Sequence, residues 1–329
     1  MRKFIFKIFV ISGIVALIFF LMLICLPMDK DCYIREYNKK IEIIKTTPNP
    51  RLILIGASTL AFGVDSKQIS DSLGINVINM GLHAGIGARY YLDDYLQYIR
   101  KGDIVLISPS YYSDFIEGAN GFPETMPDLM IATNWRNIEK LNIYQILQLI
   151  KGTPFYCLRN FMDFFKSPIK EFDPKQKNLE FHFIASGFNE YGDEISHWII
   201  PSKNIKQNIE AEETKISNKI TKVDENFLVY LKDIIDNYKR KGAYVLLMPE
   251  ISSHKNYVEY NPIQIKNIMN KYDMDFFTNP KNLEFHDSCS YDEWGAAHLS
   301  REGVTQASQR IATLLRGQMH LRHLFDYNN

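Results

Sequence analysis

The sequence Arg51-Leu-Ile-Leu-Ile-Gly-Ala-Ser-Thr-Leu-Ala-Phe-Gly-Val-Asp65 decides the fold that we expect for this chain. Its apolar run from Leu52 to Ile55 is typical of a fully buried strand. Gly56-Ala57-Ser58 ends that run, and a helical stretch follows over residues 66–73. A hydroxyl at the carboxyl end of a strand lies where ligands bind in open α/β sheets. Taken alone, the segment is better explained as a turn and a helix cap, because glycine and serine favour both.

Further short apolar runs follow along the chain, and segments with helical spacing of apolar residues separate most of them. Strands and helices in alternation are typical of a parallel sheet with helices on both faces. We therefore predict an α/β fold. The predicted further strands are 75–80, 104–107, 244–248 and 274–277, and the predicted helices are 90–99, 224–241, 262–272 and 301–315.

The regular alternation stops between residues 117 and 222. Within this range, residues 139–150 and 155–165 have helical patterns, and residues 171–200 mix aromatic with charged side chains. We predict a large helical insertion into the α/β domain, which forms helices or a lid over one face of the sheet. Long inserted segments of this kind often carry substrate contacts.

The amino terminus predicts a membrane anchor. Residues 8–26 are uncharged and apolar, a length sufficient for a helix that crosses a bilayer. A cleavable signal peptide is the competing interpretation, but no Ala-x-Ala pattern follows the apolar run. Arg2, Lys3 and Lys7 precede the run, which predicts a cytoplasmic amino terminus and a main domain outside the cytoplasmic membrane.

The chain is expected to have three parts. Residues 1–28 form the signal-anchor helix, 29–50 a juxtamembrane segment with helical character, and 51–329 the α/β domain with its insertion. Pro48-Asn49-Pro50 marks the start of the domain, because proline disfavours helix in the residue before it.

The composition excludes some classes of function. The 329 residues carry a formal net charge of zero, so no basic excess is present to bind nucleic acid. Neither a Gly-Lys-Ser/Thr loop nor a Gly-x-Gly-x-x-Gly motif occurs, which makes a nucleotide-binding α/β protein a weak alternative and predicts no cofactor. The cysteines lack metal-ligand spacing, so no metal is expected either. They leave open which pair, if any, forms a disulfide among Cys32, Cys157 and Cys289.

A second group of chemically capable residues precedes the last helix. Asp292 and His298 lie on one predicted loop, in the segment Tyr291-Asp-Glu-Trp-Gly-Ala-Ala-His-Leu-Ser-Arg-Glu-Gly303. A serine nucleophile needs a neutral imidazole to accept its proton, and that imidazole needs a carboxylate to fix its tautomer. Alone, His298 is better explained as a capping or core residue. Together with Ser58, it favours a Ser-His-Asp site.

These motifs together resemble the SGNH, or GDSL-like, hydrolase superfamily in a membrane-anchored form. Gly56-Ala-Ser58 corresponds to its first block, Asn79-Met-Gly81 to its second, and Asp292 with His298-Leu-Ser-Arg-Glu-Gly303 to its last. The resemblance covers the α/β framework and not the insertion. It implies a flavodoxin-like parallel sheet of about five strands. It further implies Ser58 as nucleophile, His298 as base, Asp292 as the orienting acid, and the backbone amides of Ser58 and Gly81 as the oxyanion hole.

The sequence departs from the family pattern at two places. The third block usually supplies an asparagine as a further oxyanion donor, whereas this chain has Ser108-Pro-Ser-Tyr-Tyr112, in which Ser110 or Tyr111 could substitute as donors. Similar replacements occur in membrane-linked SGNH-like proteins of surface-polysaccharide pathways. The acid is also farther from the histidine than usual, so Glu293 and Asp287 are alternatives to Asp292.

The resemblance leads to two hypotheses for the function. The first is an extracytoplasmic serine esterase or O-acyltransferase that acts on acyl groups, most simply acetyl groups, of a cell-envelope glycan. Its partners would be that glycan or another acyl-ester substrate, the membrane, and for a transferase a membrane-bound protein that supplies acyl groups. The second is a non-catalytic SGNH-shaped scaffold that binds polysaccharide or an assembly partner, which the missing third-block asparagine favours.

Overall fold

The computed structural model describes residues 2–25, 31–116, 118–164, 184–199, 222–290 and 298–318. Its centre is a parallel sheet of four strands in the order β2-β1-β3-β4. The strands are β1 (Arg51–Gly56), β2 (Asn76–Asn79), β3 (Ile104–Ser108) and β4 (Tyr244–Leu247). Four of the predicted strands are therefore confirmed.

The predicted count of about five strands is not confirmed. Residues 274–277 form no strand, and Phe276 makes a single parallel bridge to Leu247 beside β4. Asp273 enters this segment in a left-handed conformation with φ 56°, and Pro280 follows shortly after. A proline cannot donate to a ladder, so little extended chain is left to pair. Instead, β5 (Ser252–Ser253) and β6 (Glu284–Phe285) form a separate two-stranded sheet that we did not predict.

The side chains of β1 divide between two hydrophobic cores, one on each face of the sheet. Ile53 and Ile55 belong to a core with α2, α5 and α9, whereas Leu52 and Leu54 belong to a core with α4 and α12. Successive side chains of a strand point to opposite faces, so a strand that is apolar throughout requires helices on both sides. The prediction of a parallel sheet covered on both faces is confirmed.

The helices agree with the predicted segments in most places. Residues 139–150 and 155–165 were predicted as separate helices, but most of them form the single helix α7, which contains Pro154. The helices are α1 (Arg2–Cys25), α2 (Glu36–Thr46), α3 (Ser58–Ala61), α4 (Ser66–Leu73), α5 (Ala88–Tyr95), α6 (Met126–Ala132), α7 (Ile143–Phe164), α9 (Glu225–Arg240), α10 (His254–Tyr260), α11 (Pro262–Met269) and α12 (Arg301–Arg316). The 3-10 helices are η1 (Tyr33–Arg35), η2 (Ala84–Ile86), η3 (Leu96–Tyr98), η4 (Trp135–Lys140), η5 (Ala185–Gly187), η6 (Ser196–Ile199), η7 (Asn270–Tyr272), η8 (Pro280–Leu283) and η9 (Asp287–Cys289).

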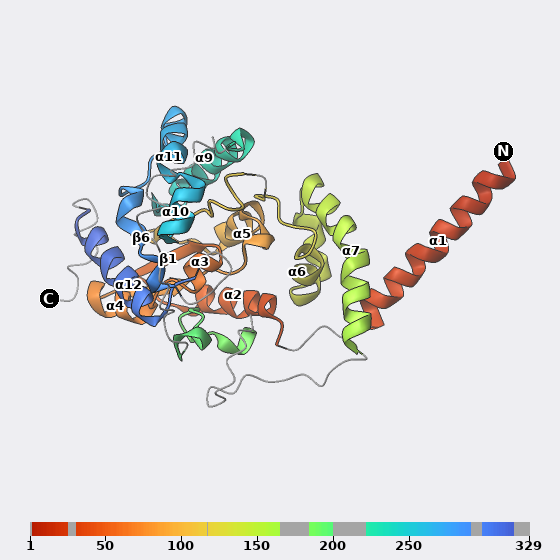
Figure 1. The fold of residues 1–329 in the computed structure, drawn as a ribbon, viewed down its shortest axis with the longest axis horizontal. Coiled ribbons are helices and arrows are strands. Elements are labelled where there is room, and N and C mark those ends of the chain that lie inside the picture. The colour runs from red at the N-terminus through yellow and green to blue at the C-terminus, as the bar shows by residue number, and fades with distance from the viewer. Residues whose placement is uncertain are drawn as a thin grey trace.

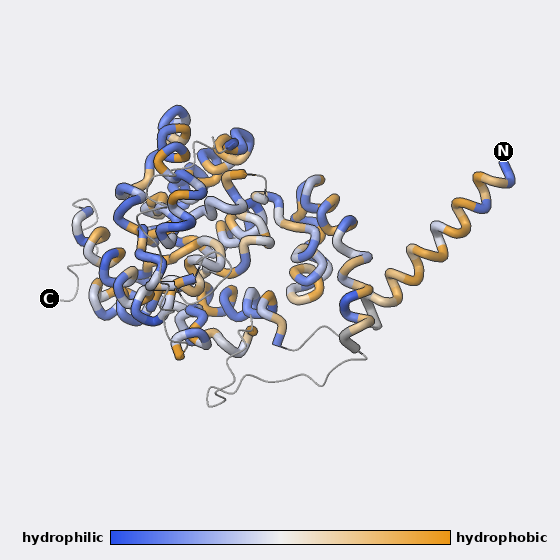
Figure 2. The backbone as a smooth tube through the Cα atoms, viewed as in Figure 1, coloured by the Kyte–Doolittle hydropathy of each residue, from blue (hydrophilic) through white to orange (hydrophobic). Residues whose placement is uncertain are grey.

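Helix α1 is apolar along nearly all its length and extends away from the sheet (Figures 1 and 2). Its segment Arg2–Met22 is long and apolar enough to cross a membrane or to act as a signal anchor, and none of it is buried against the protein. A helix with an exposed apolar surface all round is stable in lipid rather than in water.

The juxtamembrane helix α2 is packed into the domain. Lys40 is buried, and its Nζ donates to the backbone oxygen of Asn79 at 2.8 Å and to that of Gly192. Burial lowers the pKa of Lys40 to about 8, against the opposing effect of Glu36 and other nearby carboxylates. The end of β2 is thus tied to α2 and to residues 184–199.

Candidate functional site

Ser58 lies at the carboxyl edge of the sheet, at the start of α3 and directly after β1. The sharp exit from β1 depends on Gly56, because a Cβ atom there would lie 2.7 Å from the backbone oxygen of Ser108 on β3. Ser58 is partly buried. The first N–H groups of a helix have no partner within the helix. The N–H of Ser58 has no acceptor among the described residues either.

His298 comes into contact with Ser58 from the other end of the chain. Its Nε2 lies 3.1 Å from the Ser58 Oγ, although 240 residues separate the two in sequence. In the tautomer that carries its proton on Nδ1, Nε2 accepts a hydrogen bond from the serine hydroxyl. This distance is within the range expected of a nucleophile and its base.

The backbone around His298 is held by a short antiparallel contact. Leu299 bridges to Ser290, and the N–H of Ser300 donates to the Cys289 oxygen at 2.6 Å. Ser300 then caps α12 by accepting from the N–H of Gly303. A Cβ atom at Gly303 would lie 2.7 Å from the Cys289 oxygen, so a glycine allows the helix to approach. These contacts fix the residue that follows His298.

The ring of Phe62 supports the imidazole of His298. The two rings are stacked, with centroids 4.4 Å apart and an angle of 27° between them. Phe62 is itself fully buried, against Tyr33 on one side and His197 on another. Sequence reasoning missed Phe62, although it lies only four residues after Ser58.

Of the three candidate acids, the structure describes only Asp287. Asp292 and Glu293 lie outside the described residues. Asp287 is buried at the start of η9, and its Oδ1 accepts from the backbone N–H of Lys255 at 3.0 Å. At least one oxygen of Asp287 is therefore occupied by the first turn of α10, and the choice among the three acids stays open.

The two predicted oxyanion donors have different surroundings. The N–H of Ser58 belongs to the first turn of α3 and has no acceptor among the described residues. The N–H of Gly81 donates to the side-chain Oδ1 of Asn79 at 2.9 Å. Asn79 is held in turn by its Nδ2, which donates to Leu60 O and to Asp193 Oδ1. A substrate oxygen would have to share the Gly81 amide with Asn79 or displace it.

Ser110 and Tyr111, the predicted substitute donors, belong to a network around two buried carboxyls. The N–H of Ser110 donates to Asp114, and the N–H of Tyr111 donates to Glu250. The Tyr111 hydroxyl also accepts from the backbone N–H of Glu250 at 3.1 Å, and the Ser110 side chain is close enough to the Glu250 carboxyl to lower its pKa. The structure therefore places both residues next to Glu250 and not in a hydrogen bond to Ser58.

Glu250 links this network to the turn that carries Ser58. The hydroxyl of Thr59, the residue after Ser58, donates to Glu250 Oε1 at 2.9 Å. Burial raises the pKa of Glu250 to about 7, although its hydrogen bonds oppose the shift. Burial likewise raises the pKa of Asp114 to about 6. Sequence reasoning missed Glu250, for which the only signal was its position at the end of a predicted strand.

A second histidine, His83, lies near the site and follows the second block. Its Nδ1 accepts from the N–H of Gly85 at 3.0 Å, so the neutral ring carries its proton on Nε2. Burial, and to a lesser extent the charge of His298, lowers the pKa of His83 to about 4. His83 is therefore neutral near pH 7.

Residues 184–199 lie against the part of the chain that carries Ser58. Glu194 and His197 are both buried, with His197 Nδ1 2.8 Å from Glu194 Oε2. The N–H of Glu194 donates to the backbone oxygen of Ala61 in α3, and Asp193 accepts from Ser66 and Asn79. This segment of the predicted insertion thus packs against the turn that carries Ser58.

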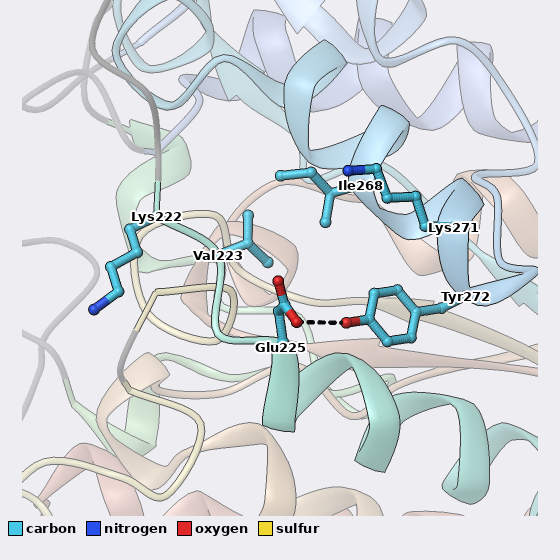
Figure 3. Close-up of a pocket in the computed structure, with 6 residues that line it drawn as sticks. All are labelled: Lys222, Val223, Glu225, Ile268, Lys271 and Tyr272. Atoms are coloured by element: carbon cyan, nitrogen blue, oxygen red, sulfur yellow. Dashed lines mark hydrogen bonds between the residues drawn. The ribbon is translucent and has the colours of Figure 1, made fainter.

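One cavity lies away from Ser58 and His298. It has a volume of about 460 Å³ and is bounded by α9, α11 and η7 (Figure 3). Tyr272 donates a hydrogen bond of 2.9 Å to Glu225 across it. None of its residues contacts Ser58 or His298, so it does not extend the site. The lining residues are Lys222, Val223, Glu225, Ile268, Lys271 and Tyr272.

The cysteines and metal-binding side chains form no further site in the described part of the chain. No disulfide joins Cys32, Cys157 and Cys289 in this part of the chain. No group of three or more His, Cys, Asp or Glu side chains there is arranged to hold a metal ion.

Comparisons of the chain with protein-family models and with curated proteins found no match.

Proposed function

We propose that this chain is a membrane-anchored, extracytoplasmic serine esterase or O-acyltransferase of the SGNH type. Its substrates would be acyl esters, most simply acetyl groups, of a cell-envelope glycan. The observation that carries the proposal is the 3.1 Å contact between Ser58 Oγ and His298 Nε2. The two residues come from opposite ends of the chain and meet at the carboxyl edge of a parallel sheet, where α/β proteins bind ligands.

The strand order supports the same family. The order β2-β1-β3-β4 matches the first four positions of a flavodoxin-like sheet, and Phe276 pairs beside β4 where a fifth strand would lie. In this arrangement β1 and β3 are adjacent and the order reverses between them. Ser58 follows β1 directly, so it lies at the expected binding crevice.

The reaction would proceed through an acyl-enzyme. His298 Nε2 accepts the proton of Ser58 as Oγ attacks the ester carbonyl carbon, and the developing oxyanion is met by the N–H groups of Ser58 and Gly81. The carbonyl re-forms as the bond to the alcohol oxygen breaks, and His298 donates its proton to that oxygen. Water then releases the acid in an esterase, whereas a second sugar hydroxyl takes up the acyl group in a transferase.

The compartment follows from α1. With α1 in the bilayer, Arg2, Lys3 and Lys7 favour a cytoplasmic amino terminus. The domain after it would then lie on the outer side, where envelope glycans are found.

A serine-directed fluorophosphonate tests this proposal. Labelling of the full-length chain in membranes that is abolished by Ser58→Ala, together with turnover of an aryl acetate that is lost in the same variant, would support it. Thr59→Ala is the matched control, because it removes a neighbouring hydroxyl that touches Glu250 and not His298. Turnover in Ser58→Ala at the parent's rate would disprove the proposal.

A non-catalytic scaffold is the second candidate, and one observation favours it. The Gly81 amide is already bonded to Asn79, while the N–H of Ser110 is bonded to Asp114 and that of Tyr111 to Glu250. Removal of one oxyanion donor costs about 3–4 kcal/mol of transition-state stabilisation. If the parent chain is neither labelled nor active while it remains folded, the scaffold is the better description.

A further inference from the structure

Helix α7 has an unusually apolar exposed surface. Ten of its side chains from Ile143 to Met162 are exposed, and the only charged ones are Lys151 and Arg159. Arg159 is paired with Asp128 of α6 at 2.6 Å. The other eight are apolar or aromatic: Ile143, Tyr144, Leu147, Ile150, Phe155, Leu158, Phe161 and Met162. Large contiguous apolar surfaces of this kind mark a binding face.

The opposite side of α7 is fixed against the domain. Gln145, Leu149 and Tyr156 are buried at helical spacing, and Gly152 continues the same stripe. A Cβ atom at Gly152 would lie 1.7 Å from the backbone oxygen of Pro123, so this part of α7 touches the chain that leads into α6. With this face occupied by the domain, the apolar face must point away from it.

Helix α9 shows what a water-facing helix of this protein looks like. Its exposed side chains are polar or charged except for Val229. The difference between α7 and α9 therefore does not reflect a general excess of apolar surface. The exposed residues of α9 are Glu225, Asn226, Val229, Asp233, Lys239 and Arg240.

The position of α7 beside α1 indicates what covers its apolar face. The Sγ of Cys157 lies 3.6 Å from the backbone oxygen of Phe19, and Figure 1 shows α7 along the carboxyl-terminal end of α1. Phe19 lies within the candidate span Arg2–Met22, about 5 Å before its end at the helical rise of 1.5 Å per residue. If α1 is in the bilayer, the contact at Cys157 lies at bilayer depth as well.

We infer that α7 lies in the membrane interface and buries its apolar face in the lipid leaflet at the carboxyl-terminal end of α1. This inference rests on the membrane position that the proposed function gives to α1. Helix α7 carries Lys151, Arg159 and Asp163, so it suits the interface better than a second span. Lys151 is exposed and can extend its ammonium group toward lipid headgroups. The protein would then contact the membrane at two places.

Photocrosslinking to lipid tests the inference in the full-length chain. The chain is reconstituted in vesicles of phosphatidylcholine and phosphatidylglycerol, with benzoylphenylalanine placed at one position at a time. The test positions are Phe155 and Phe161, which are 71% and 47% exposed. Tyr112 is the matched aromatic control on the globular part, with 59% exposure, and Phe9 in α1 is the control for the anchor.

We expect at least about tenfold more lipid adduct at Phe155 and Phe161 than at Tyr112, in yields similar to Phe9, because an interfacial helix buries its apolar face among acyl chains. Yields at both test positions as low as at Tyr112, with Phe9 labelled, would overturn the inference and leave the anchor intact. A chain-to-chain adduct at Phe155 in place of a lipid adduct would overturn it in favour of a second copy on this face. An absence of lipid adduct at Phe9 would overturn the anchor on which the inference rests.

Discussion

His298 and His197 pack against the same phenylalanine and do different things. Their rings lie 4.4 Å and 5.2 Å from the ring of Phe62, so both are part of one aromatic cluster. His298 is 7% exposed and meets the hydroxyl of Ser58, whereas His197 is wholly buried and meets the carboxylate of Glu194. The two histidines therefore differ in their partner: His298 meets a hydroxyl at the edge of the sheet, whereas His197 meets a buried acid.

The largest expected effect is on turnover. Ser58→Ala and His298→Ala should each lower kcat for ester turnover by about 10⁴-fold or more, and the double variant should lose no more than either single one, because such residues act as one unit. Steady-state kinetics on an aryl acetate measures this. His197→Ala, compared per folded molecule, should stay within a few-fold of the parent. Additive losses in the double variant would show that Ser58 and His298 act separately.

Glu250, a buried acid that contacts the residue after Ser58, should make the stability of the protein depend on pH. Its folded pKa of about 7 lies above the ordinary 4.5, so between these values the folded state holds a proton that the unfolded state has lost. The free energy of unfolding should therefore fall as pH rises from 4.5 to 7, with a contribution from Glu250 of up to about 3 kcal/mol.

Urea unfolding at several pH values measures this contribution. Glu250→Gln should flatten the slope, while other carboxyls with raised pKa values remain in both chains. Asp114→Asn, which removes a carboxyl whose pKa is raised to about 6, should flatten it less. An unchanged slope in Glu250→Gln would mean that Glu250 is ionised throughout this range.

A smaller effect separates the two histidines by stability. His197→Gln should lower the free energy of unfolding by about 1–3 kcal/mol, because it leaves the buried carboxylate of Glu194 without its imidazole. His298→Gln should cost less, since His298 lies at the edge of the site and contacts a partly exposed hydroxyl. Urea denaturation of both variants gives the comparison, and equal losses would contradict the structural role of His197.

The smallest effect concerns the support that the two rings share. Phe62→Leu keeps an apolar side chain but removes the stacked ring under His298, and should lower kcat/KM by about fivefold, in line with about 1 kcal/mol for an aromatic pair. The fall should be in kcat with little change in KM, because the ring orients the base and is not expected to bind substrate. A change in KM alone would place Phe62 in a substrate contact instead.

Much of the framework could be predicted from the sequence, because its strands are short apolar runs and the apolar residues of its helices recur at helical spacing. The same runs placed Ser58 at a strand end, and the spacing after His298 placed that histidine before α12. Glu194 and His197 were not accessible, since residues 184–199 have little regular structure and their burial comes from contacts with α3 and α2. Residues 274–277 show the opposite error, because an apolar run predicted a strand where the structure pairs only Phe276.

The way in which Asp31 is held limits how far the domain can travel. Its carboxylate accepts from the N–H and the hydroxyl of Ser186, so this residue is fixed to the folded domain. Only six peptide steps connect it to Cys25 at the end of α1, a contour of about 20 Å at most. With α1 in the bilayer, as proposed, such a short connection keeps the domain at the membrane surface. A polymer that extends outward through the envelope could then be modified only near its membrane-proximal end, or before its export is complete.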